Sequence, residues 1–286
     1  MRIDLHTHSN ASDGTDDPAQ LVRVAAEAGL DVVALTDHDT TAGWAEAEQA
    51  RPKGLRLVRG AELSCVCPDG HGNSISVHLL AYLFDPDHPS VLVEQSRLRV
   101  ERRERLVKMV TRMSEDGYPV DPETFLDRLP ADLPAGRPHL ARALVEEGVV
   151  SSVNEAFVKL LNNGSRYYIP RADTPVEQAI AMITDAGGVC VFAHPFARRR
   201  GRVVAPSVVA DLAAIGLVGV EMDHPDHEPA DRELIRGLAA ELGLLATGSS
   251  DYHGTNKTTP IGAETTDPEV FDRLVAKATA VPVLGC

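Results

Sequence analysis

Histidines and carboxylates stand at the ends of several short apolar runs in this sequence, and both side-chain types bind metals. His6 and His8 form a His-x-His pair after the first run, and Asp251 and His253 repeat that spacing. In extended backbone, residues i and i+2 point to the same side, so each pair can reach one ion. A single histidine at such a position is more often structural, but the joint pattern predicts a polynuclear metal site. The remaining candidates are His38, Glu62, His78 and His194.

The elements that must position these side chains are seven short runs rich in Val, Ile and Leu, which predict strands. They span residues 3–5, 31–36, 55–59, 75–84, 188–193, 217–222 and 244–247. Helical patterns lie between most of them. One covers 18–28 and ends at Gly29; in another, 174–186, Thr174, Pro175 and Glu177 fit an N-cap, a first-turn proline and a capping-box acid. This alternation predicts an α/β fold with a mostly parallel sheet, whose functional groups gather at the carboxyl ends of the strands.

Residues 85–170 break the alternation, because they carry helical patterns and no convincing strand. The expected helices span 89–116, 122–129, 137–148 and 153–163. We therefore predict a catalytic domain from residues 1–84 and 171–286, with 85–170 as a helical insertion that caps the substrate. Basic residues at 97–108 alternate with glutamates at helical spacing, which favours a solvated helix face over a phosphate-binding patch.

The charge balance limits the possible partners. The chain has 28 Lys and Arg against 42 Asp and Glu, a formal net charge of −14, which disfavours duplex nucleic acid and anionic membranes as partners. The cysteines at 65, 67, 190 and 286 show no disulfide-like spacing, which favours a reducing compartment. The sequence shows neither an apolar run of about 18 residues nor a signal-peptide pattern, so we expect a cytoplasmic protein.

The motifs taken together resemble those of the PHP (polymerase and histidinol phosphatase) superfamily of phosphoesterases, in family order. They occupy residues 4–9 (Asp-Leu-His-Thr-His-Ser), 12–14 (Ser-Asp-Gly), 36–39 (Thr-Asp-His-Asp), 60–62 (Gly-Ala-Glu), 193–195 (Ala-His-Pro) and 250–254 (Ser-Asp-Tyr-His-Gly). The insertion is similar, more loosely, to that of the nucleotide-phosphatase branch, through residues 136–139 (Gly-Arg-Pro-His) and 168–171 (Tyr-Ile-Pro-Arg). The resemblance implies a distorted (β/α)₇ TIM-like barrel that holds three divalent metals.

The resemblance also implies which residues bind each metal. The first metal is held by His6, His8, Glu62 and Asp251. Glu62 bridges to a second metal, which His78 and His194 complete, and His71 is the alternative to His78. The third metal is held by Asp13, His38 and His253. Asp37 and Asp39 are expected to accept hydrogen bonds from ligand imidazoles, although Asp39 could instead approach a metal directly.

The expected chemistry is metal-assisted hydrolysis. A hydroxide that bridges two metals, held by Glu62 and the ions, attacks phosphorus in line, while the metals stabilise the developing charge. Three divalent ions outweigh three ligand carboxylates, so the site attracts phosphate despite the acidic chain. Ligation by nitrogen and oxygen fits Mn²⁺, Fe²⁺ or Zn²⁺. His224 or His227 could protonate the leaving oxygen; polar loop residues are the alternative reading of both.

Substrate contacts are expected from the insertion. The resemblance assigns Arg137, His139 and Arg171 to the rest of the substrate, and arginine suits bidentate phosphate recognition. The arginines at 198, 199, 200 and 202 either line the mouth of the site or form a solvated loop. The predicted function is a phosphomonoesterase for a small phosphorylated substrate, with a nucleoside 3′,5′-bisphosphate or monophosphate leading. The alternatives are a histidinol phosphatase, a 5′→3′ exonuclease on short RNA, and a metal-binding regulatory module without catalysis.

Overall fold

The computed structural model describes residues 1–130, 133 and 135–285. The chain divides into two compact units. The first, the barrel unit, comprises Met1–Glu94 and Asp173–Cys286, and the second, the insertion unit, comprises Gln95–Ala172. Whether these units are the two domains predicted from the sequence, with borders at 85 and 170, stays a prediction.

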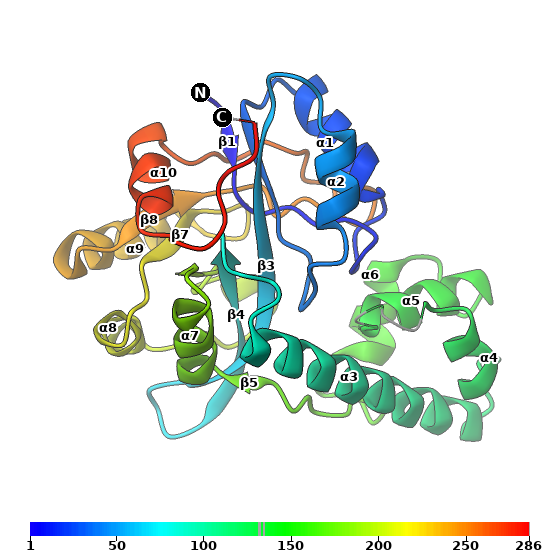
Figure 1. Cartoon of the computed structure of the whole chain (residues 1–286). Helices are drawn as coiled ribbons and strands as arrows, with labels where there is room; N and C mark the ends of the chain where they lie inside the picture. The colour runs from blue at the N-terminus through cyan, green and yellow to red at the C-terminus, as the bar shows by residue number, and fades with distance from the viewer. Residues whose placement is uncertain (131–132, 134, 286) are drawn as a thin grey trace. The chain divides into compact units, whose positions relative to one another are not determined.

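The barrel unit is built on one mixed sheet that curves into a nearly closed barrel (Figure 1). Its order is β1-β2-β3-β4-β6-β7-β8, with β5 paired to β3. Only the β3–β4 and β4–β6 pairs are antiparallel among the described strands. The strands are β1 (Ile3–Asp4), β2 (Val32–Leu35), β3 (Arg56–Pro68), β4 (Ser74–Tyr82), β5 (Thr174–Pro175), β6 (Val189–Phe192), β7 (Gly219–Asp223) and β8 (Leu245–Gly248).

The first and last strands approach each other just beyond their carboxyl ends. A parallel bridge joins Thr7 to Tyr252, and the amide of His8 donates to the carbonyl of Tyr252 at 2.8 Å. The seven predicted strands and the α/β architecture are therefore confirmed, in a TIM-like barrel arrangement. The barrel brings the segments after β1 and after β8 side by side, although more than two hundred residues separate them.

Helices cover the outside of the sheet and bury their apolar faces against it. The helical segments of the barrel unit are α1 (Pro18–Glu27), α2 (Trp44–Ala50), α7 (Val176–Asp185), the 3₁₀ turn η2 (Arg198–Arg200), α8 (Pro206–Ala214), α9 (Pro229–Leu242) and α10 (Pro268–Val275). The Asp17 side chain caps α1 by accepting from the amide of Gln20, and Gly29 follows the helix at φ 74°. Leu21, Val22 and Ala25 of α1 are fully buried against the strands, so this helix fixes the turn between β1 and β2.

The insertion unit is helical, as predicted, and carries no strand in its described residues. Its helical segments are α3 (Pro89–Glu115, which begins in the barrel unit), α4 (Pro122–Asp127), α5 (Arg137–Glu146), α6 (Val153–Ala156) and the π-helical turn η1 (Phe157–Leu161). Leu106, Met109, Leu140 and Leu144 are fully buried in a core of its own. No helix in the described part of the chain is both long and apolar enough to cross a membrane.

Two local predictions were wrong. The third strand does not stop at residue 59 but runs to Pro68, because antiparallel pairing with β4 from Gly60↔Tyr82 to Pro68↔Ser74 extends it. Thr174 is not the N-cap of α7. Thr174–Pro175 instead pairs with β3, and the Thr174 hydroxyl donates to Glu94. The helix begins at Val176 without a side-chain cap.

Candidate metal centre

Four side chains, two from the segment after β1, one from within β3 and one from the segment after β8, bring their ligand atoms together in the barrel unit. His6 Nε2 lies 3.0 Å from His8 Nε2, and Glu62 Oε2 lies 3.2 and 3.1 Å from the two nitrogens. Asp251 Oδ1 lies 3.4 Å from His6 Nε2 and 3.5 Å from His8 Nε2. All four side chains are buried, so no water competes freely for these atoms.

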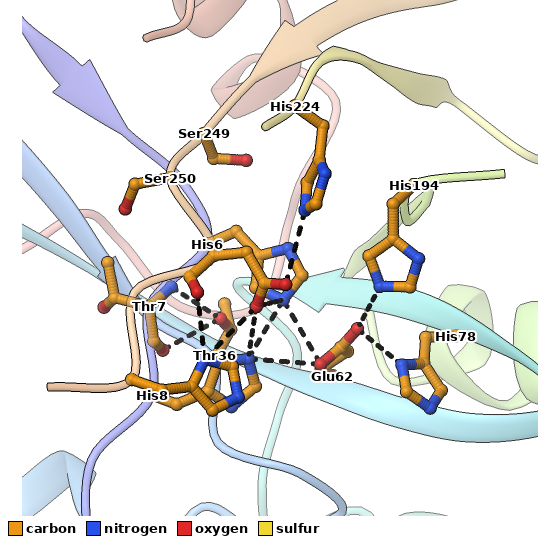
Figure 2. A network of polar contacts seen from close by, with 12 residues as sticks. His6, Thr7, His8, Thr36, Glu62, His78, His194, His224, Ser249 and Ser250 are labelled. Atoms are coloured by element: carbon orange, nitrogen blue, oxygen red, sulfur yellow. Dashed lines mark hydrogen bonds and ion pairs between the residues drawn. The ribbon is translucent and has the colours of Figure 1, made fainter. Parts of the chain in front are cut away.

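Glu62 faces two groups of histidines with its two carboxylate oxygens (Figure 2). Oε2 faces His6, His8 and also His38, whose Nδ1 is 3.1 Å away. Oε1 faces His78 Nδ1 at 2.8 Å and His194 Nε2 at 3.0 Å. This arrangement arises because Glu62 lies inside β3, whose register sets His78 of β4 diagonally across from it. One carboxylate therefore lies between two separate clusters of imidazoles.

A third group forms where the turn after β1 meets the loops after β2 and β8. Asp13 Oδ1 lies 3.3 Å from His253 Nε2, and Asp13 Oδ2 lies 3.7 Å from His38 Nε2. The turn is tight, because a Cβ on Gly14 would overlap the carbonyl of His8. His8 stacks on His253 with ring centroids 4.0 Å apart, so it adjoins this group as well as the first.

The geometry of the donors fits divalent cations. Around an ion at about 2.1 Å, ligand atoms stand roughly 3.4 Å apart in a tetrahedron and roughly 3.0 Å apart at adjacent octahedral corners. The distances from His6 Nε2 and His8 Nε2 to one another, to Glu62 and to Asp251 run from 3.0 to 3.5 Å. In addition, His8 Nδ1 and His38 Nδ1 are buried and make no hydrogen bond within the described residues. Buried polar atoms of this kind are expected where a ligand completes the site.

The electrostatics favour ionised carboxylates, which is the form that binds metal. Burial alone would raise the pKa of Glu62, but the neighbouring His78, His6 and His38 outweigh it and hold that pKa well below its usual range. Burial would likewise raise the pKa of Asp251, and Lys257, His6 and Arg200 lower it instead. Burial would lower the pKa of His8, but its contacts with Asp251 and Glu62 raise it to about 9.

Two of these residues have strained backbones. His194 has φ 28° and Asp251 has φ 51°, in the left-handed region that residues with a Cβ rarely adopt. Each lies directly past a strand end, β6 and β8 respectively. Such strain persists only where the surroundings over-determine it, and it is concentrated at functional sites. The fold thus turns both side chains toward the cluster at a cost in backbone energy.

Glu221 of β7 is a site residue that the sequence reasoning missed. Its Oε1 lies 3.1 Å from His6 Nδ1, its Oε2 accepts from the backbone amide of His194 at 2.8 Å, and the Ser249 hydroxyl also donates to it. It therefore orients His6 and fixes the loop of His194. A single acid inside the otherwise apolar run 217–222 was the available signal.

The structure separates the two general-acid candidates. His224 is fully buried, its Nε2 lies 3.3 Å from Asp251 Oδ2, and its Nδ1 accepts from the amide of Asp226. His227 engages backbone with both nitrogens: Nδ1 bonds the carbonyl of Met222 at 2.8 Å and Nε2 accepts from the amide of Phe196 at 3.4 Å. Both nitrogens of His227 are engaged by backbone, which favours a structural role for it, and the assignment of the acid role to either histidine stays a prediction.

The contacts of Asp37 differ from those predicted, whereas the predicted role of Asp39 stays a prediction. The carboxylate of Asp37 accepts from the Ser9 amide at 2.8 Å, the Ser9 hydroxyl at 2.6 Å and the Ser12 hydroxyl at 2.7 Å. Within the described residues it bonds no imidazole, so it fixes the turn that carries Asp13. Asp39 Oδ1 accepts from the amide of Ser64 at 2.7 Å and ties the loop after β2 to β3. His71, the alternative to His78, is exposed at the tip of the β3–β4 hairpin.

The substrate residues expected from the insertion lie within that unit. Arg137 Nη1 donates to the carbonyl of Leu161 at 2.7 Å and to Asn163 at 2.9 Å, and its guanidinium lies over the ring of Tyr168. His139 is buried and accepts from the amide of Gly136 with Nδ1, which caps α5. Arg171 lies close enough to Arg105 to lower the pKa of Arg105. His139 therefore has a capping role that the sequence reasoning did not foresee.

The insertion unit also concentrates guanidinium groups around Arg105. This residue is 6% exposed, its Nε donates to the carbonyl of Ile169 at 2.6 Å, and its Nη2 has no hydrogen-bond partner among the described residues. Burial, together with Arg137, Arg171 and Arg102, lowers the pKa of Arg105 to about 9. Arg105 and Arg137 lie over the same Tyr168 ring, at 5.4 and 5.3 Å from its centroid. An anion bound here would relieve the repulsion among these cations.

Sequence comparison matches residues 4–147 to the family described as the PHP domain. The chain is 32% identical over 255 residues to a 5′-3′ exoribonuclease of Haemophilus influenzae, covering 88% of this chain and 90% of the relative. It is 32% identical over 256 residues to a phosphoribosyl 1,2-cyclic phosphate 1,2-diphosphodiesterase of Eggerthella lenta, covering 89% and 95%. It is also 32% identical over 252 residues to a 3′,5′-nucleoside bisphosphate phosphatase of Chromobacterium violaceum, covering 88% and 87%.

Structural comparison agrees with the sequence matches. A crystal structure from Bifidobacterium adolescentis, described as that of a metal-dependent phosphoesterase, superposes with a TM-score of 0.89 at 35% identity. The superposition covers 97% of this chain and 96% of the other. The similarity therefore extends over both units and is not confined to the histidine motifs.

Proposed function

The chain belongs to the PHP family of metal-dependent phosphoesterases, and we propose that it hydrolyses a phosphomonoester of a nucleotide, with a nucleoside 3′,5′-bisphosphate as the leading substrate. The observation that carries the hydrolytic part is Glu62, whose two oxygens face separate groups of histidines at 2.8–3.2 Å. A carboxylate in that position can bridge two metal ions, as two-metal phosphoesterases require.

We assign the metals to three groups of residues. One would be held by His6, His8, Glu62 and Asp251, a second by Glu62, His78 and His194, and a third by Asp13, His38 and His253. Nitrogen and oxygen donors without thiolate favour Mn²⁺, Fe²⁺ or Zn²⁺. When bound, such ions supply a hydroxide nucleophile and polarise the phosphoryl oxygens.

The chain's own groups prepare the site for this chemistry. The low pKa values of Glu62 and Asp251 keep both carboxylates ionised at neutral pH. Glu221 holds His6 Nδ1, so that Nε2 faces Glu62 and Asp251. His224 accepts a backbone amide with Nδ1, which leaves the proton of the neutral ring on Nε2. That proton is the one we propose for the leaving oxygen.

The nucleotide part rests on the insertion unit. Its cluster of guanidinium groups around Arg105 and Tyr168 suits a second phosphate, since neighbouring cations that lower the pKa of a buried arginine favour an anion. An aromatic ring beside arginines also suits a base or ribose. We propose that Arg137 and Arg171 contact this second part of the substrate. The similarity to a 3′,5′-nucleoside bisphosphate phosphatase of Chromobacterium violaceum supports that assignment.

Substrate comparison with arginine variants tests this assignment. Arg137→Ala or Arg171→Ala should cost about 1.5–3 kcal/mol for adenosine 3′,5′-bisphosphate, roughly 10- to 150-fold in kcat/KM. p-Nitrophenyl phosphate should lose much less, because it lacks the second phosphate. Arg128→Ala, an exposed arginine of the same unit, is the control. Equal losses on both substrates would assign the arginines to the common phosphoryl site, and no loss on either would remove the support for a nucleotide.

An exonuclease acting on short RNA is the second candidate, because relatives of this name match nearly the whole chain. The same proposed metal centre would hydrolyse RNA, and the two candidate functions differ only in the length of the substrate. A panel of adenosine 3′,5′-bisphosphate, histidinol phosphate and short 5′-phosphorylated RNA, assayed with Mn²⁺, separates the candidates. Stepwise shortening of RNA at a higher kcat/KM than the bisphosphate would replace the leading substrate.

A further inference from the structure

The two oxygens of Asp251 face different kinds of partner. Oδ1 faces the imidazoles of His6 and His8, at 3.4 and 3.5 Å. Oδ2 instead accepts from Arg200 Nη2 and from Lys257 Nζ, each at 2.6 Å, and also lies 3.3 Å from His224 Nε2. One buried carboxylate thus separates the metal ligands from a pair of cations. The cations come from different segments, η2 after β6 and the loop after β8.

Arg200 differs from the other arginines of its segment. Arg198 pairs with Asp231 at 2.8 Å, Arg199 pairs with Glu228, and Arg202 lies 3.7 Å from Asp69. None of these three partners is a proposed metal ligand. Among the described residues of this segment, only Arg200 reaches a proposed metal ligand. Its Nε is held by Asp226 at 2.6 Å, so the guanidinium has a fixed direction.

The positive charges of Arg200 and Lys257 beside Asp251 Oδ2 are not fully balanced once metal ions occupy the centre. When Asp251 binds a divalent ion through Oδ1, its single negative charge is offset by the ion and attracts the two cations on Oδ2 less strongly. Arg200 and Lys257 retain donors beyond those bonded to Asp251 and Asp226, because a guanidinium has five and an ammonium has three. Both side chains are only about one-third exposed. An oxyanion beside the metals would satisfy these donors and the excess charge together.

We propose that Arg200 and Lys257 bind the phosphoryl group that is hydrolysed, each donating to a non-bridging oxygen beside its bond to Asp251. This inference rests on the proposed phosphoesterase function and adds two substrate-binding residues to it. Charge in phosphoryl transfer is spread over the non-bridging oxygens, so cations placed here stabilise the transition state as well as the bound phosphate. The arginines at 198, 199 and 202 take no part.

The test measures phosphate affinity apart from metal content. Arg200→Met and Lys257→Met are compared with Arg199→Met, the neighbour in the same turn whose partner is Glu228. Inorganic phosphate binding to the metal-loaded protein is followed by calorimetry, and bound metal is counted by mass spectrometry. We expect each of the first two variants to weaken phosphate binding roughly 10- to 100-fold with unchanged metal content, and Arg199→Met to match wild type.

Two results would overturn the proposal. Unchanged phosphate affinity at full metal content would show that the cations do not touch the phosphoryl group. Loss of bound metal would show that they act by holding Asp251 in place. Arg200→Lys keeps a cation and guards against misfolding, and it should recover part of the affinity. If wild type binds phosphate but hydrolyses no phosphomonoester, the proposed function fails while the binding comparison still decides this inference.

Discussion

The two units both bury charged side chains, but they do so with opposite chemistry. In the barrel unit, imidazole nitrogens face the carboxylate of Glu62 at 2.8–3.2 Å. In the insertion unit, guanidinium groups gather around Arg105 and lower its pKa to about 9. Ionised carboxylates among neutral donors favour a cation, whereas crowded cations favour an anion. The sign of the buried charge therefore indicates the ligand of each unit.

The largest effect should come from removing the charge of Glu62. Glu62→Gln keeps the shape but provides only one oxygen able to bind a metal, so two ions can no longer share it. We expect kcat to fall by about a thousandfold, because several kcal/mol of transition-state stabilisation depend on the ions. The measurement combines turnover with metal content, and Glu177→Gln, on the exposed side of α7, is the control. Near-normal turnover would refute the bridging role; excess chelator should abolish wild-type activity in the same assay.

A smaller effect is expected at Glu221, which contacts the proposed ligand His6 and is not among the metal ligands that we propose. The His194 amide and the Ser249 hydroxyl both donate to Glu221. In Glu221→Gln one of these donors faces the side-chain NH₂ group, which cannot accept a hydrogen bond. We expect metal affinity and activity to fall about 10- to 100-fold, the usual range for residues that orient metal ligands. Metal titration with a competing chelator gives the affinity. If the affinity is unchanged while the protein is less stable, Glu221 is purely structural.

The insertion unit should respond to anions without any metal. Arg105 has a folded pKa below its unfolded value, so its repulsion is fully present below about pH 9 and is relieved as pH rises above it. At neutral pH, phosphate should therefore stabilise the chelated protein, by about 2–4 °C in Tm for each kcal/mol of binding free energy. In Arg105→Met the phosphate-dependent gain should shrink, and in Lys108→Met, on the exposed face of α3, it should persist. Equal gains in all three proteins would contradict an anion site here.

The smallest effect is expected from a hydrogen bond between β4 and the segment after β1, next to the proposed ligand His6. The buried hydroxyl of Tyr82 donates to the carbonyl of Leu5 at 2.7 Å, one residue before His6. Tyr82→Phe should cost about 1–2 kcal/mol of unfolding free energy, because it leaves that carbonyl unsatisfied. Urea denaturation measures this cost, and kcat should stay within a few-fold of wild type. A large loss of activity would mean that small shifts of β1 disturb the centre.

The sequence predicted the strands and identified histidines and carboxylates that the structure brings together, because both predictions depend on local patterns. Apolar runs identify β2 and β6 directly, and His-x-His identifies a pair on one side of a strand. Glu221 could not be recognised as an orienting residue, since its partner His6 is 215 positions away. The pairing of β3 with β4 past residue 59 was also missed, although it is a local hairpin that joins residues 60–68 to 74–82. Arg200 is indistinguishable in sequence from its neighbours, and only the ion pairs separate them.

The bridge between Thr7 and Tyr252 has a consequence for biosynthesis. The proposed ligands His6 and His8 are translated more than two hundred residues before Asp251 and His253, so a nascent chain lacks the later pair until the segment after β8 has been translated. Until then the proposed metal site lacks two of its ligands, so tight metal binding should follow translation of that segment. Ribosome-bound chains stalled before β8 should take up radioactive zinc far more weakly than released protein; equal uptake would show that an earlier fragment already forms the centre.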